Sequence, residues 1–380
     1  MAEGEGEDEV LAVVERFADT FGRGSAEALE SLYDSRLMAL SIYGTKDFRL
    51  DDAGLETLMG ALSTTSIHVG SIILKHHRIT SSQVIVDKII RDENRPASSP
   101  LRYLDLENND IDYEGAIPII DCLGEMEFGL ETLNLSCNPI GTEAAQRISD
   151  SVSVNKMPKL RHLLVANCDF SLKAIIALTT SLERNLEALV LDRPIIKSNE
   201  EEHTDHFARL LSAHSTLAEV SLRHNKIFDR GATYIAQALT DNKSLMLLNL
   251  ECNSISVAGA ESIASYLMKV NRLQTLFLSY NNIQDEGAIA IAQALERNTS
   301  LRDLTLKTNN IGPKGLIAIG GAMEKNNTLQ NLMLFGNHFD NSTCAAFGRL
   351  MEERFPYIGV SLDIEVYVVD GVHHVALKEV

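Results

Sequence analysis

The chain has 380 residues, of which 45% are hydrophobic, and a formal net charge of −19 at pH 7. This length provides one large domain or two ordinary ones, with a substantial buried core. The acidic charge argues against nucleic acid, whose phosphates are bound by clustered Lys and Arg. It suits protein partners with basic surfaces, and it also keeps a protein soluble, which is the simpler interpretation.

Residues 1–35 predict an acidic tail followed by a helical cap. Apolar side chains in "EVLAVVERFADTFGR" recur at helical spacing, at Val10, Val13, Val14, Phe17 and Phe21. "SAEALESLY" can extend this segment into a helical pair. The first ten residues lack the basic and apolar regions of a signal peptide, so none is predicted. We interpret the segment as an N-terminal cap, and a partner-binding helix is the alternative.

A repeated pattern follows and is clearest from Leu101. "LRYLDLENNDI" has leucine at its first, fourth and sixth positions, asparagine at the ninth and isoleucine at the eleventh. Cys168 and Pro194 take the asparagine position in the third and fourth copies. Nine clear copies begin 26 to 31 residues apart, at Leu101, Leu130, Leu160, Leu186, Leu217, Leu245, Leu273, Leu301 and Leu329. Such self-similarity at one period predicts a repeat architecture.

One or two degenerate copies precede the clear ones. "VGSIILKHHRI" begins at Val69 and has His77 in the asparagine position. "LMALSIYG" begins at Leu37 and is the weaker candidate, with an insertion before Gly54. The predicted repeat array therefore covers residues 36–345.

Each copy predicts one strand and one helix. The L-x-L core predicts a short strand with alternate side chains pointing inward. Segments such as "GAIAIAQALERN" place apolar residues at i, i+3, i+4 and i+7, which predicts a helix with one buried face. Stacked units give an α/β solenoid shaped as a horseshoe, with parallel strands on the concave face and helices on the convex face.

The recurring asparagines are expected to bind backbone groups where the chain bends away from each strand. Asn253 and Asn281 belong to this row. Their truncation is therefore expected to leave buried backbone groups unpaired. Asn298 lies outside the row and is expected to contribute little to stability.

An acidic insertion, residues 197–206 in "KSNEEEHTDHF", interrupts the rhythm after Pro194. His203 and His206 are three residues apart and can share one helical face, so a weak transition-metal contact is one interpretation. We favour a solvated insertion that begins a helix, because acidic residues stabilise a helix N-terminus. The sequence thus predicts no metal site here, although the insertion could also dock a partner.

Residues 346–380 predict a C-terminal cap. "IEVYVVDGVHHVAL" contains two β-rich runs around Asp370 and Gly371, and Asp-Gly favours a tight hairpin turn. This hairpin is expected to cover the last repeat. His373 and His374 are adjacent and would face opposite sides of a strand, which argues against joint metal binding.

Catalytic and membrane signatures are missing from the sequence. It has no Gly-rich phosphate loop, no H-E-x-x-H and no G-x-S-x-G, and no two carboxylates are paired for acid–base chemistry. We therefore predict no enzyme, no catalytic residues and no cofactor. No apolar run approaches the roughly 18–20 residues that span a bilayer. Five scattered cysteines without C-x-x-C predict reduced thiols in an intracellular protein.

The solvent-facing strand positions provide the candidate binding surface. They hold aromatic, apolar and charged residues, namely Phe277, Tyr280, Met333, Phe335, Lys307, Arg223, His224 and Glu251. Exposed aromatic rings beside charged groups are typical of interface anchors. The alternative is that neighbouring strands or the C-terminal hairpin cover some of these side chains.

From about Val69 to Cys344 the chain resembles the ribonuclease-inhibitor-like class of leucine-rich repeat proteins. The "LDRPII" repeat with its acidic insertion, "GNHFDNSTCAAF" and "VVDG" also resemble leucine-rich repeat proteins associated with ciliated and germ-line tissue, some of them nuclear or nucleolar. This resemblance implies a cytoplasmic scaffold or adaptor in a multi-protein assembly, such as that of a cilium or axoneme.

Two alternatives stay open. A nuclear or nucleolar adaptor is one. A GTPase regulator is the other, because the Ran GTPase-activating protein shares this repeat class. That family carries a strongly acidic C-terminal tail, whereas this chain ends in "HHVALKEV" and has its acidic run at the other end. The difference favours the scaffold.

Overall fold

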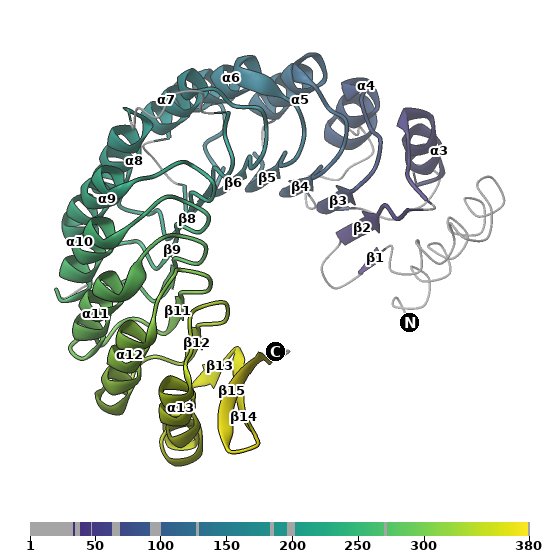
Figure 1. Ribbon diagram of the computed structural model, residues 1–380. Coiled ribbons are helices and arrows are strands. Elements are labelled where there is room, and N and C mark those ends of the chain that lie inside the picture. The colour runs from purple at the N-terminus through teal and green to yellow at the C-terminus, as the bar shows by residue number, and fades with distance from the viewer. Residues whose placement is uncertain are drawn as a thin grey trace, which may run out of the picture. The chain divides into compact units, whose positions relative to one another are not determined.

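A computed structural model describes residues 33–34, 39–46, 48–62, 69–91, 100–126, 129–182, 186–195, 202–269 and 272–378. The chain divides into two compact units, one ending at Val190 and the other beginning at Leu191. Each unit alternates short strands with helices (Figure 1).

The first unit contains a parallel sheet in chain order. Its strands are β1 (Tyr33–Asp34), β2 (Ala39–Tyr43), β3 (Ser71–Lys75), β4 (Tyr103–Asp105), β5 (Thr132–Asn134), β6 (His162–Leu164) and β7 (Ala188–Val190). Strands β2 to β7 are parallel, and β1 is antiparallel to β2. Its helices are α3 (Asp52–Leu62), α4 (Ser82–Val84), the π-helical turn η1 (Ile85–Ile90), α5 (Tyr113–Glu125), α6 (Gly141–Ser153) and α7 (Leu172–Ser181).

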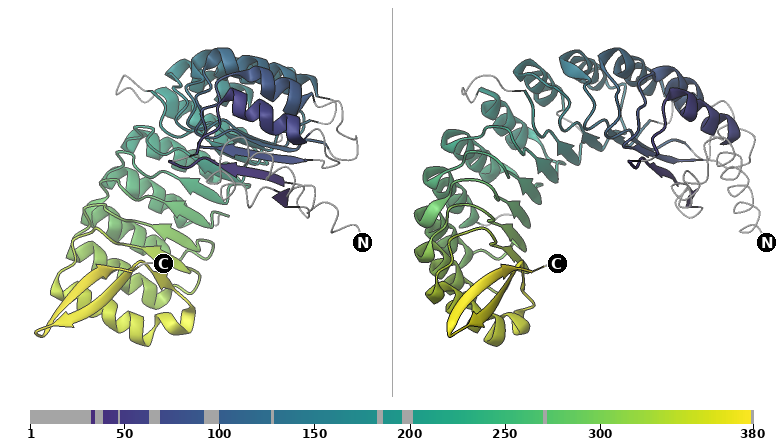
Figure 2. Two further views of the ribbon diagram at one scale, coloured as in Figure 1. Left: turned by 90° about the vertical axis from the view of Figure 1, so that its right-hand side faces the viewer. Right: turned by 45° about the vertical axis from the view of Figure 1, so that its right-hand side comes forward.

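The second unit repeats this plan. Its parallel strands are β8 (Glu219–Ser221), β9 (Leu247–Asn249), β10 (Thr275–Phe277), β11 (Asp303–Thr305), β12 (Asn331–Met333) and β13 (Ser361–Leu362). The helices form a layer on one side of these strands (Figure 2). They are α8 (Glu202–Ala213), α9 (Asp229–Asp241), α10 (Val257–Leu267), α11 (Gln284–Leu295), α12 (Pro313–Lys325), α13 (Asn341–Glu353) and α14 (Phe355–Ile358).

Strand register aligns the leucines of successive repeats. Leu248, Leu276, Leu304 and Leu332 are direct cross-strand partners, and all four are buried. Helices α10, α11 and α12 each pack on the preceding helix through a glycine near the start, namely Gly259, Gly287 and Gly315. At Gly315 a Cβ would lie 2.7 Å from Ile311 Cγ2, so only glycine fits there without a shift. The predicted α/β solenoid of parallel strands and helices is confirmed.

The asparagine row is also confirmed. Asn253 donates from Nδ2 to the carbonyl oxygens of Leu222 and Leu250, both at 2.9 Å. Its Oδ1 accepts from the backbone N–H groups of Asn225 and Ile227 at 2.9 and 3.1 Å. Each asparagine thus ties its own bend to the preceding repeat, which satisfies buried backbone groups that would otherwise be unpaired.

Two other residue types occupy this row in the first unit. His77 is buried and accepts from the Leu50 N–H at Nδ1, 3.1 Å away. Cys168 donates from Sγ to the carbonyl oxygen of Leu135 at 3.2 Å. Strands β2 and β3, from the two degenerate copies, pair in parallel with each other, and β3 pairs with β4. The degenerate copies therefore stack as the clear ones do.

The expectation for Asn298 is wrong, because a second amide row lies in the loops that return from helix to strand. Asn298 is only 5% exposed and donates from Nδ2 to the carbonyl oxygen of Leu267 at 2.8 Å. Its Oδ1 accepts from the N–H groups of Ser300 and Leu301. Asn242 and Asn326 occupy the same position and make equivalent bonds.

Pro194 breaks the first row, because proline has no N–H to donate to the next asparagine. Asn225 Oδ1, its expected acceptor, is buried and has no hydrogen-bond partner among the described residues. Residues 197–201 of the predicted insertion lie outside the described ranges. Helix α8 begins at Glu202, in agreement with the interpretation that the insertion leads into a helix.

The structure tests the predicted C-terminal cap but little of the predicted N-terminal cap. Most of the predicted N-terminal cap lies outside the described residues, and Tyr33–Asp34, at its end, form a strand. The C-terminal hairpin is confirmed as β14 (Ile364–Val369) and β15 (Val372–Leu377), with positive φ at Asp370 and Gly371. It packs against α13, and this helix crosses the predicted boundary at residue 345. None of the described helices is long and apolar enough to cross a bilayer.

Candidate functional site

The open side of the second unit's strands brings the eight predicted site residues onto one surface. Phe277 and Met333 lie in a middle row that the strand register aligns. Two residues further along each repeat lies an outer row, which holds Arg223, Glu251, Lys307 and Phe335. His224 and Tyr280 follow one residue beyond the outer row, in the turns before the asparagine row. We call this set the strand-face surface.

Tyr280 is the most exposed aromatic residue of the strand-face surface. Its side chain is 53% exposed, and its φ of 60° lies in the left-handed region. The turn requires this conformation in many repeats, where it is taken by residues such as Asn108, Cys252, Thr308 and Gly336. Left-handed backbone suits Gly, Asn and Asp, so the larger Tyr280, like Arg193 and His224 at the same position, adopts it at a cost in free energy. The fold therefore tolerates this tyrosine and does not need it.

The other large side chains on the surface are partly covered. Phe277, Met333 and Phe335 are each half-buried between neighbouring strands. The backbone N–H of Phe335 donates to the carboxylate of Asp363, which fixes this part of the chain. Only part of each of these side chains is therefore accessible to a partner.

Glu251 is held on both sides of β10. Its Oε1 accepts from Thr305 Oγ1 at 3.1 Å, two repeats away. Its Oε2 lies 3.4 Å from Arg223 Nε, an ion pair in which Nε makes no hydrogen bond. Glu251 therefore joins its own repeat to the repeats of Arg223 and Thr305. Phe277 lies on β10, the strand between Glu251 and Thr305.

Lys307 also makes an ion pair within the fold. Its Nζ lies 3.2 Å from Asp363 Oδ2, and the Asp363 side chain is buried. Asp363 Oδ1 also accepts from the Leu334 N–H at 2.7 Å. Because this ion pair joins β11 to the segment after β13, Lys307 stabilises the end of the repeat array. Its ammonium is half-exposed and borders Phe335.

His224 lies in a basic edge, which we define as Arg193, Arg223, His224 and Lys226. Arg193 donates from Nη2 to His224 Nε2 at 3.3 Å. Burial, and then the charges of Arg193 and Arg223, lower the pKa of His224. The imidazole is therefore neutral at pH 7 and adds no positive charge. The guanidinium of Arg193 and the ammonium of Lys226 are exposed.

The two histidines of the acidic stretch, His203 and His206, lie in different environments. His203 is buried, donates from Nε2 to the carbonyl oxygen of Asn225 at 2.7 Å, and packs edge-on against Phe207. It therefore faces the core, while His206 is half-exposed. Within the described ranges, no three His, Cys, Asp or Glu side chains are grouped as metal ligands would be.

A polar cluster in the first unit was missed from the sequence. Lys75 Nζ lies 3.0 Å from Asp105 Oδ2 and 2.8 Å from Glu107 Oε2. Burial lowers the pKa of Lys75, but the hydrogen bonds to Glu107 and Asp105 outweigh it and hold that pKa above its usual value. Tyr103 donates to Asp105 at 3.2 Å. The available signal was the pair of acids within "LDLEN", although the Asp105 side chain is fully buried.

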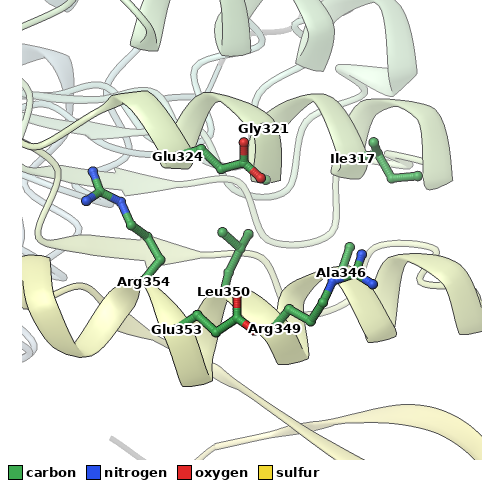
Figure 3. Close-up of a pocket in the computed structure, with 9 residues that line it drawn as sticks. Ile317, Gly321, Glu324, Ala346, Arg349, Leu350, Glu353 and Arg354 are labelled. Atoms are coloured by element: carbon green, nitrogen blue, oxygen red, sulfur yellow. The ribbon is translucent and has the colours of Figure 1, made fainter.

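The helix side of the second unit carries a groove of about 460 Å³ between α12 and α13. Figure 3 shows Ile317 and Glu324 of α12 facing Arg349, Leu350 and Glu353 of α13. Gly321 leaves this space open, since a Cβ there would meet no atom within 4 Å. At the end of the groove Arg354 donates to the carbonyl oxygens of Met323 and Asn326, and so replaces an asparagine of the second amide row.

Comparisons with known proteins agree with this repeat. A family model described as "Leucine Rich repeat" matches residues 97–119, 130–149, 241–264, 272–292 and 297–320. The search of curated proteins found no match.

Solved structures that are similar to this chain include an internalin from Listeria monocytogenes. The two share 16% sequence identity with a TM-score of 0.44, and the match covers 92% of this chain and 93% of the other. The "Leiomodin-1 Actin-Binding Site 2" structure has 18% identity and a TM-score of 0.29, covering 49% and 90%. The tropomodulin C-terminal domain of Caenorhabditis elegans has 15% identity and a TM-score of 0.34, covering 41% and 94%.

The repeat geometry and the family match lead to one conclusion. Stacked strand–helix units with an asparagine row form an extended surface that is typical of protein-interaction scaffolds. The chain carries leucine-rich repeats and folds as a leucine-rich repeat solenoid.

Proposed function

We propose that this protein is a non-catalytic scaffold or adaptor that binds another protein on the strand-face surface, with Phe277, Tyr280 and Phe335 as anchors. The observation that carries the proposal is Tyr280, a half-exposed ring on left-handed backbone. Such a conformation costs on the order of 1–3 kcal/mol, and the exposed ring returns little of this in folding. Burial under a partner would contribute about 2 kcal/mol or more per anchor.

The assembly is proposed from resemblance. The "LDRPII" repeat, "GNHFDNSTCAAF" and "VVDG" resemble leucine-rich repeat-containing protein thirty-four, a type associated with ciliated and germ-line tissue. This supports a cytoplasmic adaptor in a ciliary or axonemal complex, with the nucleus or nucleolus as the alternative location. The net charge of −19 favours encounter with partners whose surface is basic overall.

A GTPase regulator of the Ran GTPase-activating type is the second candidate, because it shares the repeat class. The chain's C-terminal sequence "HHVALKEV" lacks the acidic tail of that family, which favours the scaffold. A GTP hydrolysis assay with a panel of small GTPases separates the two. Acceleration of hydrolysis by catalytic amounts of the protein would replace the scaffold proposal.

Affinity capture tests the proposed surface. The bait is the wild-type chain or a variant with Phe277, Tyr280 and Phe335 all changed to Ser, in extracts of ciliated and non-ciliated cells. We expect partners recovered from ciliated cells to be lost with the variant. Ile317→Ser, which alters an exposed apolar residue on α12, is the matched control and should leave capture intact. Equal capture by a folded triple variant would place the interface elsewhere.

A further inference from the structure

We infer that two copies of this chain associate through β14, whose outer edge pairs antiparallel with β14 of the second copy. The contact lies in the C-terminal hairpin and uses none of the residues of the strand-face surface. It therefore goes beyond the proposed function, and either proposal can fail without the other.

The outer edge of β14 carries unpaired backbone groups. The two-residue turn makes Val369 and Val372 a hydrogen-bonded pair, so the N–H and C=O groups of Val366 and Val368 point away from β15. At this edge neither residue forms a backbone hydrogen bond with any other part of the chain that the structure describes. An exposed edge of this kind is a template for pairing with another strand.

The edge of β15 is less open. The N–H of His373 points away from β14 and donates to Asn341 Oδ1, at the start of α13, 2.8 Å away. Figure 1 shows the hairpin beside this helix at the end of the second unit. A strand added along β15 would have to displace the Asn341 side chain, so β14 is the edge that can accept a strand.

The sequence of β14, "IEVYVV", lacks the features that protect strand edges from pairing. Edge strands are commonly blunted by lysine, proline or a bulge, and β14 has none of these. Its only charged residue is Glu365. Tyr367, Val368 and Val369 are 45%, 56% and 49% exposed. An apolar strand with an open edge is therefore presented to solvent.

The order of residues in β14 suits pairing with a second β14. With the two-fold axis at Val366, the middle outward-pointing residue, Ile364 faces Val368 of the second copy. Glu365 then faces Tyr367 of the second copy and not another Glu365, so like charges do not meet along the edge. The two Tyr367 rings lie on a diagonal, within reach of each other.

This pairing has two consequences for the assembly. The two hairpins become one four-stranded sheet, which is more stable than a two-stranded one in water. Because the same edge is used by both copies, the contact is closed by two-fold symmetry and forms a dimer without further growth.

Sedimentation velocity of the full chain, at concentrations from about 1 to 100 µM, measures the association. We expect a concentration-dependent dimer with twice the 41.8 kDa mass of the chain. Val368→Pro removes an outward N–H and no hydrogen bond within the hairpin. The dissociation constant of the dimer should therefore rise about tenfold or more.

A charge exchange tests the register. Tyr367→Glu places a carboxylate opposite Glu365 of the second copy and should raise the dissociation constant about fivefold or more. Adding Glu365→Lys to this variant restores opposite charges across the edge and should recover most of the affinity. His374→Glu, on the same face of β15, is the control, because it adds the same charge one strand further from the contact.

A chain that stays monomeric at every concentration would overturn the inference and leave the β14 edge to a strand of another protein. A dimer that neither Val368→Pro nor Tyr367→Glu weakens would place the contact elsewhere. Failure of the folded Glu365→Lys, Tyr367→Glu variant to regain affinity would refute pairing of β14 with itself. Circular dichroism and melting temperature of each variant establish that lost association is not lost folding.

Discussion

Asn326 donates from its side-chain Nδ2 to the backbone carbonyl oxygen of Asn298 at 3.1 Å. Asn298 in turn donates to the carbonyl oxygen of Leu267, and Arg354 closes the series by donating to Asn326. A row of amides thus joins the return loops of successive repeats, in addition to the row at the strand ends. Each repeat of this region is therefore tied to the next at two places.

This relationship predicts that Asn298→Ala is costly. Removing the side chain takes away the donor to the Leu267 carbonyl oxygen and the acceptor of the buried Leu301 N–H, so the free energy of unfolding should fall by about 1–3 kcal/mol. Asn253→Ala, in the first row, should cost a similar amount. Asn282→Ala is the control, because that side chain is exposed. Urea unfolding of the three variants measures these free energies. Equal, small losses for all three would contradict a stabilising role for both amide rows.

Two glycines of α12 should respond in opposite ways to alanine. Gly321→Ala adds a methyl group in open space inside a helix, so stability should rise by about 0.5–1 kcal/mol. Gly315→Ala would place Cβ within 3 Å of Ile311 and Ala288 and should cost about 1–3 kcal/mol. Melting temperatures of the two variants and of wild type measure the effect of the same substitution at two positions of one helix. A loss of stability with Gly321→Ala would show that the groove is narrower than described.

His77 predicts a pH dependence. Burial lowers its pKa to about 4, against about 6.5 in an unfolded chain. Between these values the unfolded state binds a proton that the folded state does not, so stability falls as the pH drops from 6.5 toward 4. From pH 7.5 to 5 the loss from this residue is roughly 2 kcal/mol.

His77→Asn, the residue of the regular row, should remove this part of the pH dependence. Unfolding of wild type and variant by urea at pH 7.5 and pH 5 provides the comparison. Between pH 7.5 and pH 5 we expect the free energy of unfolding to fall by roughly 2 kcal/mol less in the variant than in wild type. Parallel pH profiles for the two proteins would show that the imidazole titrates normally in the folded state.

The sequence predicted the repeat because its constraints are local. Each strand needs a buried leucine at every second position, and most bends carry an asparagine. Because this pattern recurs in nine copies, the sequence alone identifies the strands and bends. Even His77 and Cys168 were located correctly, because the spacing of the flanking leucines, isoleucines and valines sets the register of each copy. The hairpin was predictable because Asp-Gly at positions 370 and 371 sets the turn.

Other features depended on packing that one sequence does not reveal. Asn298 acts through the carbonyl oxygen of Leu267, a backbone group whose position only the stacked fold supplies. Helical spacing placed His203 beside His206 but did not show that His203 faces the core. Lys307 looked like a surface cation, yet its partner Asp363 lies beyond the last clear repeat.

The most direct test of the proposed surface is affinity capture by Tyr280→Asn, compared with wild type, together with the melting temperature of both proteins. Asn adopts left-handed backbone readily, so the variant should melt at the same or a higher temperature. Quantitative mass spectrometry of partners from ciliated cells should show recovery reduced about tenfold or more, since one anchor contributes about 2 kcal/mol. Undiminished recovery by the folded variant would contradict partner binding at Tyr280.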